Sequence, residues 1–192
     1  MDKKAETHDR ILRAASTALR RNGFDGVGVS ETMKGAGLTH GGFYAHFASH
    51  EGLLVEALER AGQDGDEALR DAVAEAVQRP GGPSPFRALV EVYLSEVHAA
   101  SREGGCTMAA LGSELSRQTE AVLTVGKQRV QSVISLVRSS LPGHPEWIET
   151  VAAAMVGALQ MARILGSEEG GALLAAVRKD LLERFDVRST SR

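Results

Sequence analysis

The sequence predicts an all-α fold, in which an N-terminal head of three helices is followed by a longer helical region. Hydrophobic residues make up 43% of the 192 residues but aromatic residues only 4%. Alanine and leucine are abundant and β-branched runs are scarce, which favours helices over sheets. Apolar residues also recur every three or four positions, and glycine- or proline-rich breaks separate these segments. A chain of this length can bury a core in one or two domains.

The first helix is expected from Ala5 to Asn22. Ile11, Ala15 and Leu19 follow one another at four-residue spacing, which lines one face of a helix with apolar side chains. Gly23 is expected to end this helix, because glycine can leave the helical conformation at no steric cost.

Residues 29–47 predict two short helices joined by a tight glycine turn. The first is expected from about Ser30 to Ala36 and ends at Gly37, which can adopt the left-handed conformation. Thr39 supplies a side-chain oxygen to cap the second helix, which begins at His40. This helix starts with a histidine and two glycines, so its backbone can approach a large partner closely. The major groove of DNA is the surface that such a helix-turn-helix fits.

The second helix of this pair is expected to have two different sides. Phe43 and Phe47 lie four positions apart and should face the core of the head. Thr39, His40 and Tyr44 lie opposite, where they can reach base edges and phosphates. Since few of these side chains hydrogen-bond to bases, methyl and shape contacts are expected to share the readout. The expected DNA contacts are Ser30, Lys34, Thr39, His40, Gly41, Gly42, Tyr44, His46 and His50.

A fourth helix is expected to begin after Ser49, whose side chain can cap it, with Glu51 in the first turn. It should continue as a long rod to Val77, and Gly62 and Gly65 are the points where the rod can kink. Further helices are expected at about Phe86–Ala100, Thr107–Leu115, Thr119–Ser140, Glu146–Leu165 and Ala172–Phe185, with glycine- or proline-containing breaks between them.

Charge is distributed unevenly along the chain. Residues 1–50 carry seven lysines or arginines against five acidic residues, whereas the whole chain has a net charge of −3. Four of the six histidines also lie in this segment, where a nearby phosphate would favour their protonation. The charge pattern therefore favours a nucleic-acid partner at one end of the chain only.

The segment AGLTHGGFYAHFASHEGL, from Ala36 to Leu53, resembles the signature of the TetR family of one-component transcriptional regulators. The family pattern joins an Ala-Gly turn, a small polar cap, an aromatic-Tyr-x-His-Phe stretch and a Ser-Lys-Glu sequence. The resemblance implies a repressor that binds a pseudo-palindromic double-stranded DNA operator as a homodimer and responds to a small-molecule effector. It also implies that Tyr44 and His46 contact the DNA backbone.

Three positions depart from the family pattern. Gly28 stands where a serine or threonine usually caps the first helix of the motif, and Thr32 stands where an apolar core residue is usual. His50 replaces the usual lysine after the serine, which is expected to weaken one phosphate contact.

With this resemblance, the chain divides into a helix-turn-helix DNA-binding domain at residues 1–50, a ligand-binding and dimerisation domain at 51–185, and a disordered tail at 186–192. The effector site is expected among the C-terminal helices, where apolar bulk is combined with a few polar groups. An ordinary core position explains each of these residues equally well. The expected ligand contacts are Tyr93, His98, Cys106, Met108, Leu111, Trp147 and Met155.

The last two helices are expected to form a dimer interface. Val151–Ala162 is apolar on nearly all faces, and such a helix needs burial on several sides. Burial within one protomer is the alternative. Two apolar helices at the end of the chain favour a two-fold four-helix interface, as in the family, with Leu159 and Leu181 as interface positions.

We expect no metal, cofactor or catalytic site. His46 and His50 have the spacing of a helical metal-ligand pair, but the residues between them should interrupt the helix. Cys106 is the one cysteine and follows two glycines. A redox-sensing regulator that uses this thiol is one alternative function. A helical interaction protein or enzyme without DNA binding is the other, because a corner between two helices is common geometry.

The sequence predicts a cytoplasmic protein without a membrane partner. The longest uninterrupted apolar stretch, Val151–Leu159, is far shorter than the roughly 20 residues that span a bilayer. The N-terminal ten residues are polar and contain no apolar signal core. A single cysteine is typical of a reducing compartment.

Overall fold

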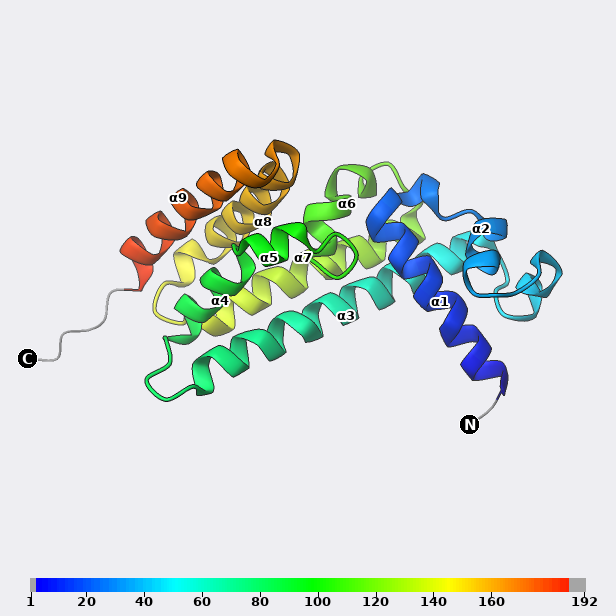
Figure 1. Cartoon of the computed structure of the whole chain (residues 1–192), viewed down its shortest axis with the longest axis horizontal. Helices are drawn as coiled ribbons and strands as arrows, with labels where there is room; N and C mark the ends of the chain where they lie inside the picture. Colours follow the sequence, from blue (N-terminus) through cyan, green and yellow to red (C-terminus); the bar gives the residue numbers. More distant parts are fainter. Residues whose placement is uncertain (1–2, 187–192) are drawn as a thin grey trace, which may run out of the picture. The chain divides into compact units, whose positions relative to one another are not determined.

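The computed structural model describes residues 3–186, and over this range every regular element is helical, which confirms the predicted all-α fold (Figure 1). The elements in chain order are α1 (Lys3–Asn22), η1 (Phe24–Gly26), α2 (Val29–Gly35), η2 (His40–Ala45), α3 (His50–Gln78), α4 (Pro85–Tyr93), α5 (Glu96–Ala100), α6 (Thr107–Leu115), α7 (Glu120–Ser140), η3 (Pro145–Trp147), α8 (Ile148–Leu165) and α9 (Ser167–Phe185), where η marks a 3-10 helix.

The described chain forms two compact units. Unit 1 contains residues 3–65 and 102–129, and unit 2 contains residues 66–101 and 130–186. The predicted N-terminal head therefore folds together with a second, distant segment that carries α6 and the first half of α7. Helices α3 and α7 are each continuous from one unit into the other.

One hydrophobic core holds unit 1 together. It combines apolar side chains of α1, α2, η2 and α3 with those of α6 and α7, which are far away in the sequence. Its buried members are Ile11, Ala15, Leu19, Phe24, Val27, Met33, Ala36, Phe43, Phe47, Leu53, Leu54, Ala57, Leu58, Leu111, Leu115, Val122 and Val125. At the predicted helix ends, Gly23 (φ 74°) and Gly37 (φ 68°) adopt the left-handed conformation.

Helix α3 runs for 29 residues without interruption, so neither Gly62 nor Gly65 breaks the helix. Instead, each glycine makes room for a neighbour. A Cβ atom at Gly62 would lie 2.3 Å from the side chain of Arg129, and one at Gly65 would lie 3.2 Å from the carbonyl oxygen of Gly105. Arg60 on the same helix adds ionic contacts to Asp9 (2.6 Å) and Asp64 (2.7 Å).

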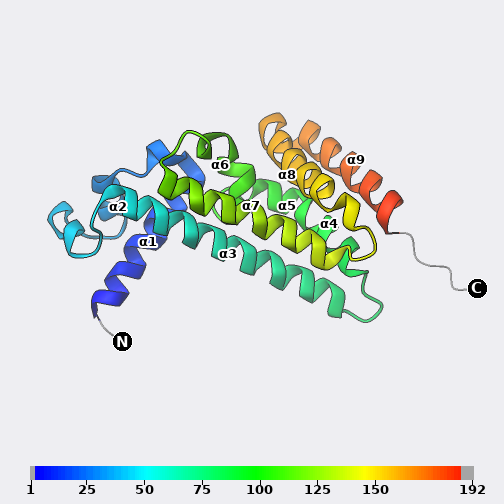
Figure 2. The same ribbon diagram turned by 180° about the vertical axis from the view of Figure 1, so that it is seen from behind.

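Unit 2 is built around the hairpin of α8 and α9, which lie side by side in both ribbon views (Figures 1 and 2). Helices α4 and α5 pack against this pair. Gly170 allows the closest approach, because a Cβ atom there would lie 2.4 Å from the carbonyl oxygen of Ala162. The fully buried side chains of this unit include Leu89, Tyr93, Leu94, Met155 and Leu159.

Three predicted elements differ from the structure. The helix expected at Phe86–Ala100 is divided into α4 and α5, because the Ser95 side chain accepts a hydrogen bond from the His98 amide and caps a new helix. The last helix begins at Ser167 instead of Ala172. Asp186, expected in a disordered tail, binds Ser84 and accepts a 2.6 Å hydrogen bond from Arg87. The remainder of the predicted tail, 187–192, lies outside the described residues.

Among the described residues, one segment, Pro145–Leu165, is long and apolar enough to cross a membrane by length and composition. In the structure it forms η3 and α8, and one face of α8 supplies a large part of the core of unit 2. A core helix has the same length and composition, so this segment is weak evidence for a membrane span.

Candidate nucleic-acid interface

The element expected to read DNA is shorter and tighter than predicted. Residues His40–Ala45 form a 3-10 helix instead of an α-helix. The predicted side-chain cap from Thr39 is absent, and its backbone carbonyl instead accepts a 3.2 Å hydrogen bond from the Gly42 amide. Gly41 and Gly42 have low helix propensity, which explains why a tight turn replaces a regular α-helix at this point.

Two phenylalanines anchor η2 in unit 1, as predicted. Phe43 is 1% exposed and Phe47 is 3% exposed, and their rings stack with centroids 5.5 Å apart. The ring of His8 stacks on Phe47 at 4.6 Å. The same histidine forms a 2.8 Å hydrogen bond with Glu56. Helix α1 thus holds Phe47 through the His8 ring, and α3 holds that ring through the Glu56 carboxylate.

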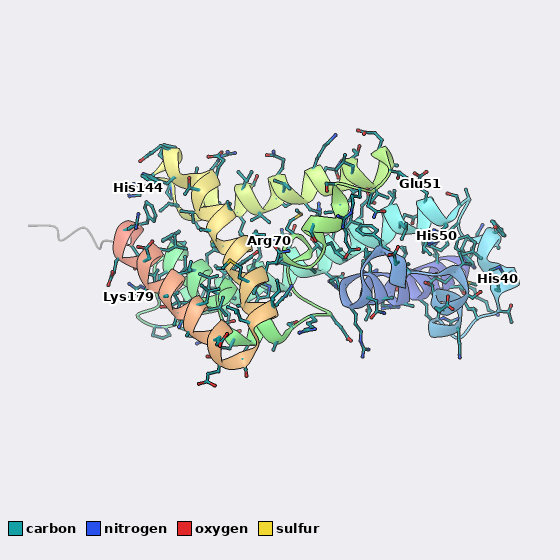
Figure 3. All side chains as sticks on the ribbon, turned by 90° about the horizontal axis from the view of Figure 1, so that it is seen from above. His40, His50, Glu51, Arg70, His144 and Lys179 are labelled. Carbon is teal, nitrogen blue, oxygen red and sulfur yellow. The ribbon has the colours of Figure 1, made fainter. Side chains whose placement is uncertain are left out.

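The outward side of η2 carries the polar and aromatic groups predicted to contact DNA. Thr39, His40 and Gly41 are exposed, and the Tyr44 side chain is 74% exposed. Figure 3 shows His40 on η2 at an edge of unit 1, and His50 and Glu51 at the start of α3. The Tyr44 ring meets Phe43 edge to face at 5.2 Å, so a buried residue supports an exposed one.

Helix α2 contributes further groups to the same surface. The Ser30 hydroxyl and the His40 Nδ1 atom form a 3.0 Å hydrogen bond, which joins the two elements of the helix-turn-helix. Lys34 is exposed in the last turn of α2. Gly42 is half-buried, and a Cβ atom there would lie 3.5 Å from the Met33 methyl group, so this position packs closely against α2.

The two remaining histidines of the predicted interface both contact the head, although His46 is half-buried and His50 is exposed. The His46 Nδ1 atom is buried and forms no hydrogen bond within the described residues. Burial lowers the pKa of the His46 ring, with smaller contributions from His8 and Lys4. The Nε2 atom of His50 lies 2.5 Å from the Val27 carbonyl oxygen. In this conformation both rings support the head instead of extending from it.

Sequence reasoning missed His8 and Glu56, which orient η2 from α1 and α3. These two residues lie 48 positions apart, and nothing in their local sequence marks them as partners. It also missed Glu114, whose carboxylate accepts a 3.0 Å hydrogen bond from the Phe24 amide. A charged residue in the last turn of an apolar helix was the one signal that could have identified Glu114.

The predicted ligand contacts are divided between the two units. Cys106, Met108 and Leu111 belong to unit 1, where Leu111 is part of the head's core. The other members belong to unit 2, and they are Tyr93, His98, Trp147 and Met155.

Within unit 2, His98 and Tyr93 lie together. Their rings meet edge to face at 4.8 Å, and the His98 Nδ1 atom lies 2.7 Å from the Tyr93 carbonyl oxygen. Burial is the largest cause that lowers the pKa of His98, and the nearby Arg163 lowers it further. Tyr93 and Met155 are 1% and 0% exposed, so a ligand would reach them only after rearrangement of this core.

Unit 2 also contains a cavity of about 300 Å³ whose lining was not predicted. Four of the six lining residues come from α7 and two from α3, and most carry a hydroxyl or a charge. The lining consists of Asp66, Arg70, Ser132, Ser135, Leu136 and Ser139. Five of these six side chains end in a hydroxyl or a charged group, and none of the six belongs to the ligand contacts expected from the sequence.

Comparison with known proteins agrees with the geometry of the head. The model for the family described as "Bacterial regulatory proteins, tetR family" matches residues 11–57, which include the C-terminal part of α1, all of α2 and η2, and the start of α3. The HTH-type transcriptional repressor NemR of Escherichia coli K12 is 27% identical over 144 residues, which cover 73% of this chain and 70% of NemR.

Solved structures extend the likeness of the fold to both units. The crystal structure of the reduced form of E. coli NemR has a TM-score of 0.70 at 24% identity, covering 91% of this chain and 96% of that one. A TetR-family transcriptional regulator from Agrobacterium tumefaciens has a TM-score of 0.75 at 21% identity, covering 95% and 99%. The chain is therefore a DNA-binding transcriptional regulator, and its residues 11–57 match the TetR family of bacterial regulatory proteins.

Proposed function

We propose that this protein is a cytoplasmic repressor that binds a pseudo-palindromic operator as a homodimer and releases it when a small molecule binds. Residues 1–50 would form the DNA-binding domain, and residues 51–185 the ligand-binding and dimerisation domain. The observation that carries the proposal is the two-sided η2. Phe43 and Phe47 are buried, whereas Thr39, His40 and Tyr44 are exposed.

In this proposal η2 enters the major groove. Gly41 lies in open space, with no atom near the position of a Cβ, so the backbone can approach the base edges. Tyr44 and the two polar residues before the glycines would contact phosphates and bases. A two-fold dimer would address half-sites about one helical turn apart, roughly 34 to 36 Å between centres.

The dimer is proposed to form through the outer face of α8. Met161, Ile164 and Leu165 are 52%, 80% and 45% exposed in the protomer. Three large apolar side chains within five residues form a surface that a soluble monomer rarely exposes. A second copy of the same helix would cover it symmetrically.

The effector is proposed to bind within unit 2 and to favour a conformation that binds DNA poorly. An effector changes operator affinity only by its differential affinity for the two conformations, typically about 1 to 3 kcal/mol, and operator changes effector affinity by the same factor. The cavity beside Arg70 is one space that an effector could enter without rearrangement of the core.

Operator binding tests the proposal directly. His40→Ala and Tyr44→Ala should each reduce operator affinity by about 1 to 3 kcal/mol without changing the stability of the fold. Lys179→Ala, in unit 2 on α9 (Figure 3), is the control and should bind like the parent. Gel-shift titration at several salt concentrations measures these affinities. Parent-like affinity of both folded η2 variants would exclude η2 as the reading element.

Redox sensing is a second candidate for the signal. Cys106 is half-buried and directly precedes α6, and the relative NemR has been solved in a form described as reduced. If an oxidant is the signal, peroxide should lower the operator affinity of the parent and leave a Cys106→Ser variant unchanged. A small-molecule effector would act equally on both.

A further inference from the structure

Helix α6 is joined to the DNA-binding head by one charged side chain. The carboxylate of Glu114 accepts a 3.0 Å hydrogen bond from the backbone amide of Phe24. This amide begins η1, the short link between α1 and α2. The two residues lie 90 positions apart in the sequence, and the contact is partly buried.

The backbone beside this contact is shaped to admit the carboxylate. Gly23 adopts a left-handed conformation with a φ of 74°, which is unfavourable for residues with a side chain. A Cβ atom at this position would lie 2.7 Å from each carboxylate oxygen of Glu114. The conformation and the close approach therefore both require glycine.

Stabilisation of α6 itself does not explain the position of Glu114. This residue lies in the last turn of α6 (Thr107–Leu115), where the helix dipole disfavours a negative charge. A backbone amide at the start of another helical element is a favourable partner for a carboxylate. The negative charge of Glu114 therefore slightly destabilises α6 and stabilises the start of η1 in the head.

Both ends of α6 are fixed within unit 1. Leu111 and Leu115 are buried in the core shared with α1, α2 and η2. At the other end, the Gly105 carbonyl approaches α3 at Gly65, directly before Cys106. Each end of α6 therefore packs against another part of unit 1. Because a helix is rigid, a displacement of one end moves the other end as well.

The contact also leads to the DNA-reading surface in few steps. Phe24 is buried, and three residues later the Val27 carbonyl oxygen lies 2.5 Å from the His50 ring at the start of α3. Helix α2 follows directly and contacts both α1 and η2. A change at Phe24 therefore alters the link that sets α2 against α1.

We propose that Glu114 is a positioning residue that ties α6 to the head, so that displacement of α6 changes the DNA-binding geometry of α2 and η2. Where this inference concerns operator release, it rests on the proposed function. The structural part, that Glu114 holds the link between α1 and α2, does not depend on operator binding.

Amide exchange in the full-length protein tests the structural part. Glu114→Ala should accelerate hydrogen exchange of the Phe24 amide by roughly ten- to hundredfold, the change expected when a hydrogen bond to a charged group is lost. Glu114→Gln keeps an acceptor oxygen and should retain most of the protection. Ser113→Ala, an exposed neighbour on the same helix, is the control. Unchanged protection in Glu114→Ala would overturn the proposal.

A double-mutant cycle keeps the test decisive if a variant is unstable. Gly23→Ala is strained by its backbone conformation in any background, but the clash with the carboxylate exists only when Glu114 is present. Gly23→Ala should therefore accelerate Phe24 exchange several-fold less in Glu114→Ala than in the parent. Equal effects in both backgrounds would contradict the proposed contact.

Operator affinity then separates the two proposals. If the parent binds operator, Glu114→Ala should weaken binding about tenfold and Glu114→Gln much less. Parent-like affinity of Glu114→Ala, together with fast Phe24 exchange, would overturn the positioning role while leaving DNA binding intact. If the parent binds no operator, the proposed function fails, and the exchange data still decide whether Glu114 holds the link.

Discussion

The two units of the molecule differ in how many large apolar side chains they expose to solvent. Unit 1 exposes one of them among its described residues, Tyr44, and this residue lies on the element predicted to contact DNA. Unit 2 exposes six, and four of these belong to η3 and α8. The six are Val97, Val130, Trp147, Met161, Ile164 and Leu165.

This difference indicates two kinds of partner. A surface that is polar except for one supported tyrosine is suited to phosphates and base edges, which bind through hydrogen bonds and charge. A surface with clustered apolar side chains is suited to another protein surface. The comparison therefore supports the proposals that unit 1 binds DNA and that unit 2 binds a second copy of the chain, and each proposal can be tested separately.

The largest expected effect concerns the anchor of the polar surface. Phe43→Ala removes a ring that is 1% exposed and stacks on Phe47. Such a substitution should lower the free energy of unfolding by about 3 to 5 kcal/mol and remove operator binding with it. Chemical denaturation measures the stability change. Tyr44→Ala, next in sequence but largely exposed, should cost less than about 0.5 kcal/mol, and equal losses would contradict the two-sided description of η2.

The second effect concerns the apolar surface of unit 2. Ile164→Asp places a charge on a side chain that is 80% exposed in the protomer, so the protomer should fold normally. Burying this charge in an interface should weaken dimerisation by about 2 kcal/mol or more. Light scattering across a dilution series reports the dissociation. Val130→Asp, also on an exposed apolar residue but on α7, should leave the dimer intact.

Local sequence was sufficient where a single helix determines the outcome. The spacing of apolar residues predicted the bounds of α6 and nearly those of α1 and α7, and Gly23 and Gly37 end their helices as expected. Phe43 and Phe47 were placed in the core for the same reason. These features depend on residues within a few positions of one another, so the sequence displays them directly.

Features that depend on distant segments could not be predicted. The union of α6 with the head, the contact of Glu114 with Phe24 and the ring contact of His8 with Phe47 join residues far apart in the chain. For the same reason, the predicted positions of the dimer interface were wrong. Leu159 and Leu181 were expected at the dimer surface, but they are 0% and 5% exposed inside the protomer, because the faces of α8 and α9 that carry them are buried within the protomer.

The third prediction concerns a buried hydroxyl group that is expected to destabilise unit 1. The hydroxyl of Thr32 is buried and forms no hydrogen bond within the described residues, at a position where an apolar residue is usual in the family. Valine has nearly the same shape without the unsatisfied group. Thr32→Val should therefore raise the free energy of unfolding by about 1 kcal/mol. Thermal or chemical denaturation measures the gain, and a loss of stability would show that the hydroxyl has a favourable partner.

The smallest expected effect is a pH dependence with one source in each unit. Burial is the main cause that lowers the pKa of His46 in unit 1 and of His98 in unit 2 below the ordinary value of 6.5. Well above pH 6.5 both rings are neutral in the folded and unfolded chains, so they contribute no pH dependence. Below that value the unfolded chain binds protons first, so stability falls as the pH decreases towards the lowered pKa values.

Glutamine substitutions assign this loss to the two units. His98→Gln should remove part of the acid destabilisation seen by the fluorescence of Trp147, the one tryptophan of the chain, which lies in unit 2. His46→Gln should act instead on amide exchange around Phe43 and Phe47 in unit 1. The comparison is made between pH 7.5 and pH 5.5, values that bracket the ordinary histidine pKa of about 6.5. If both variants kept the full pH dependence of the parent, the two buried rings would not be its source, because removing a group with a lowered pKa must remove its share of the proton uptake on unfolding.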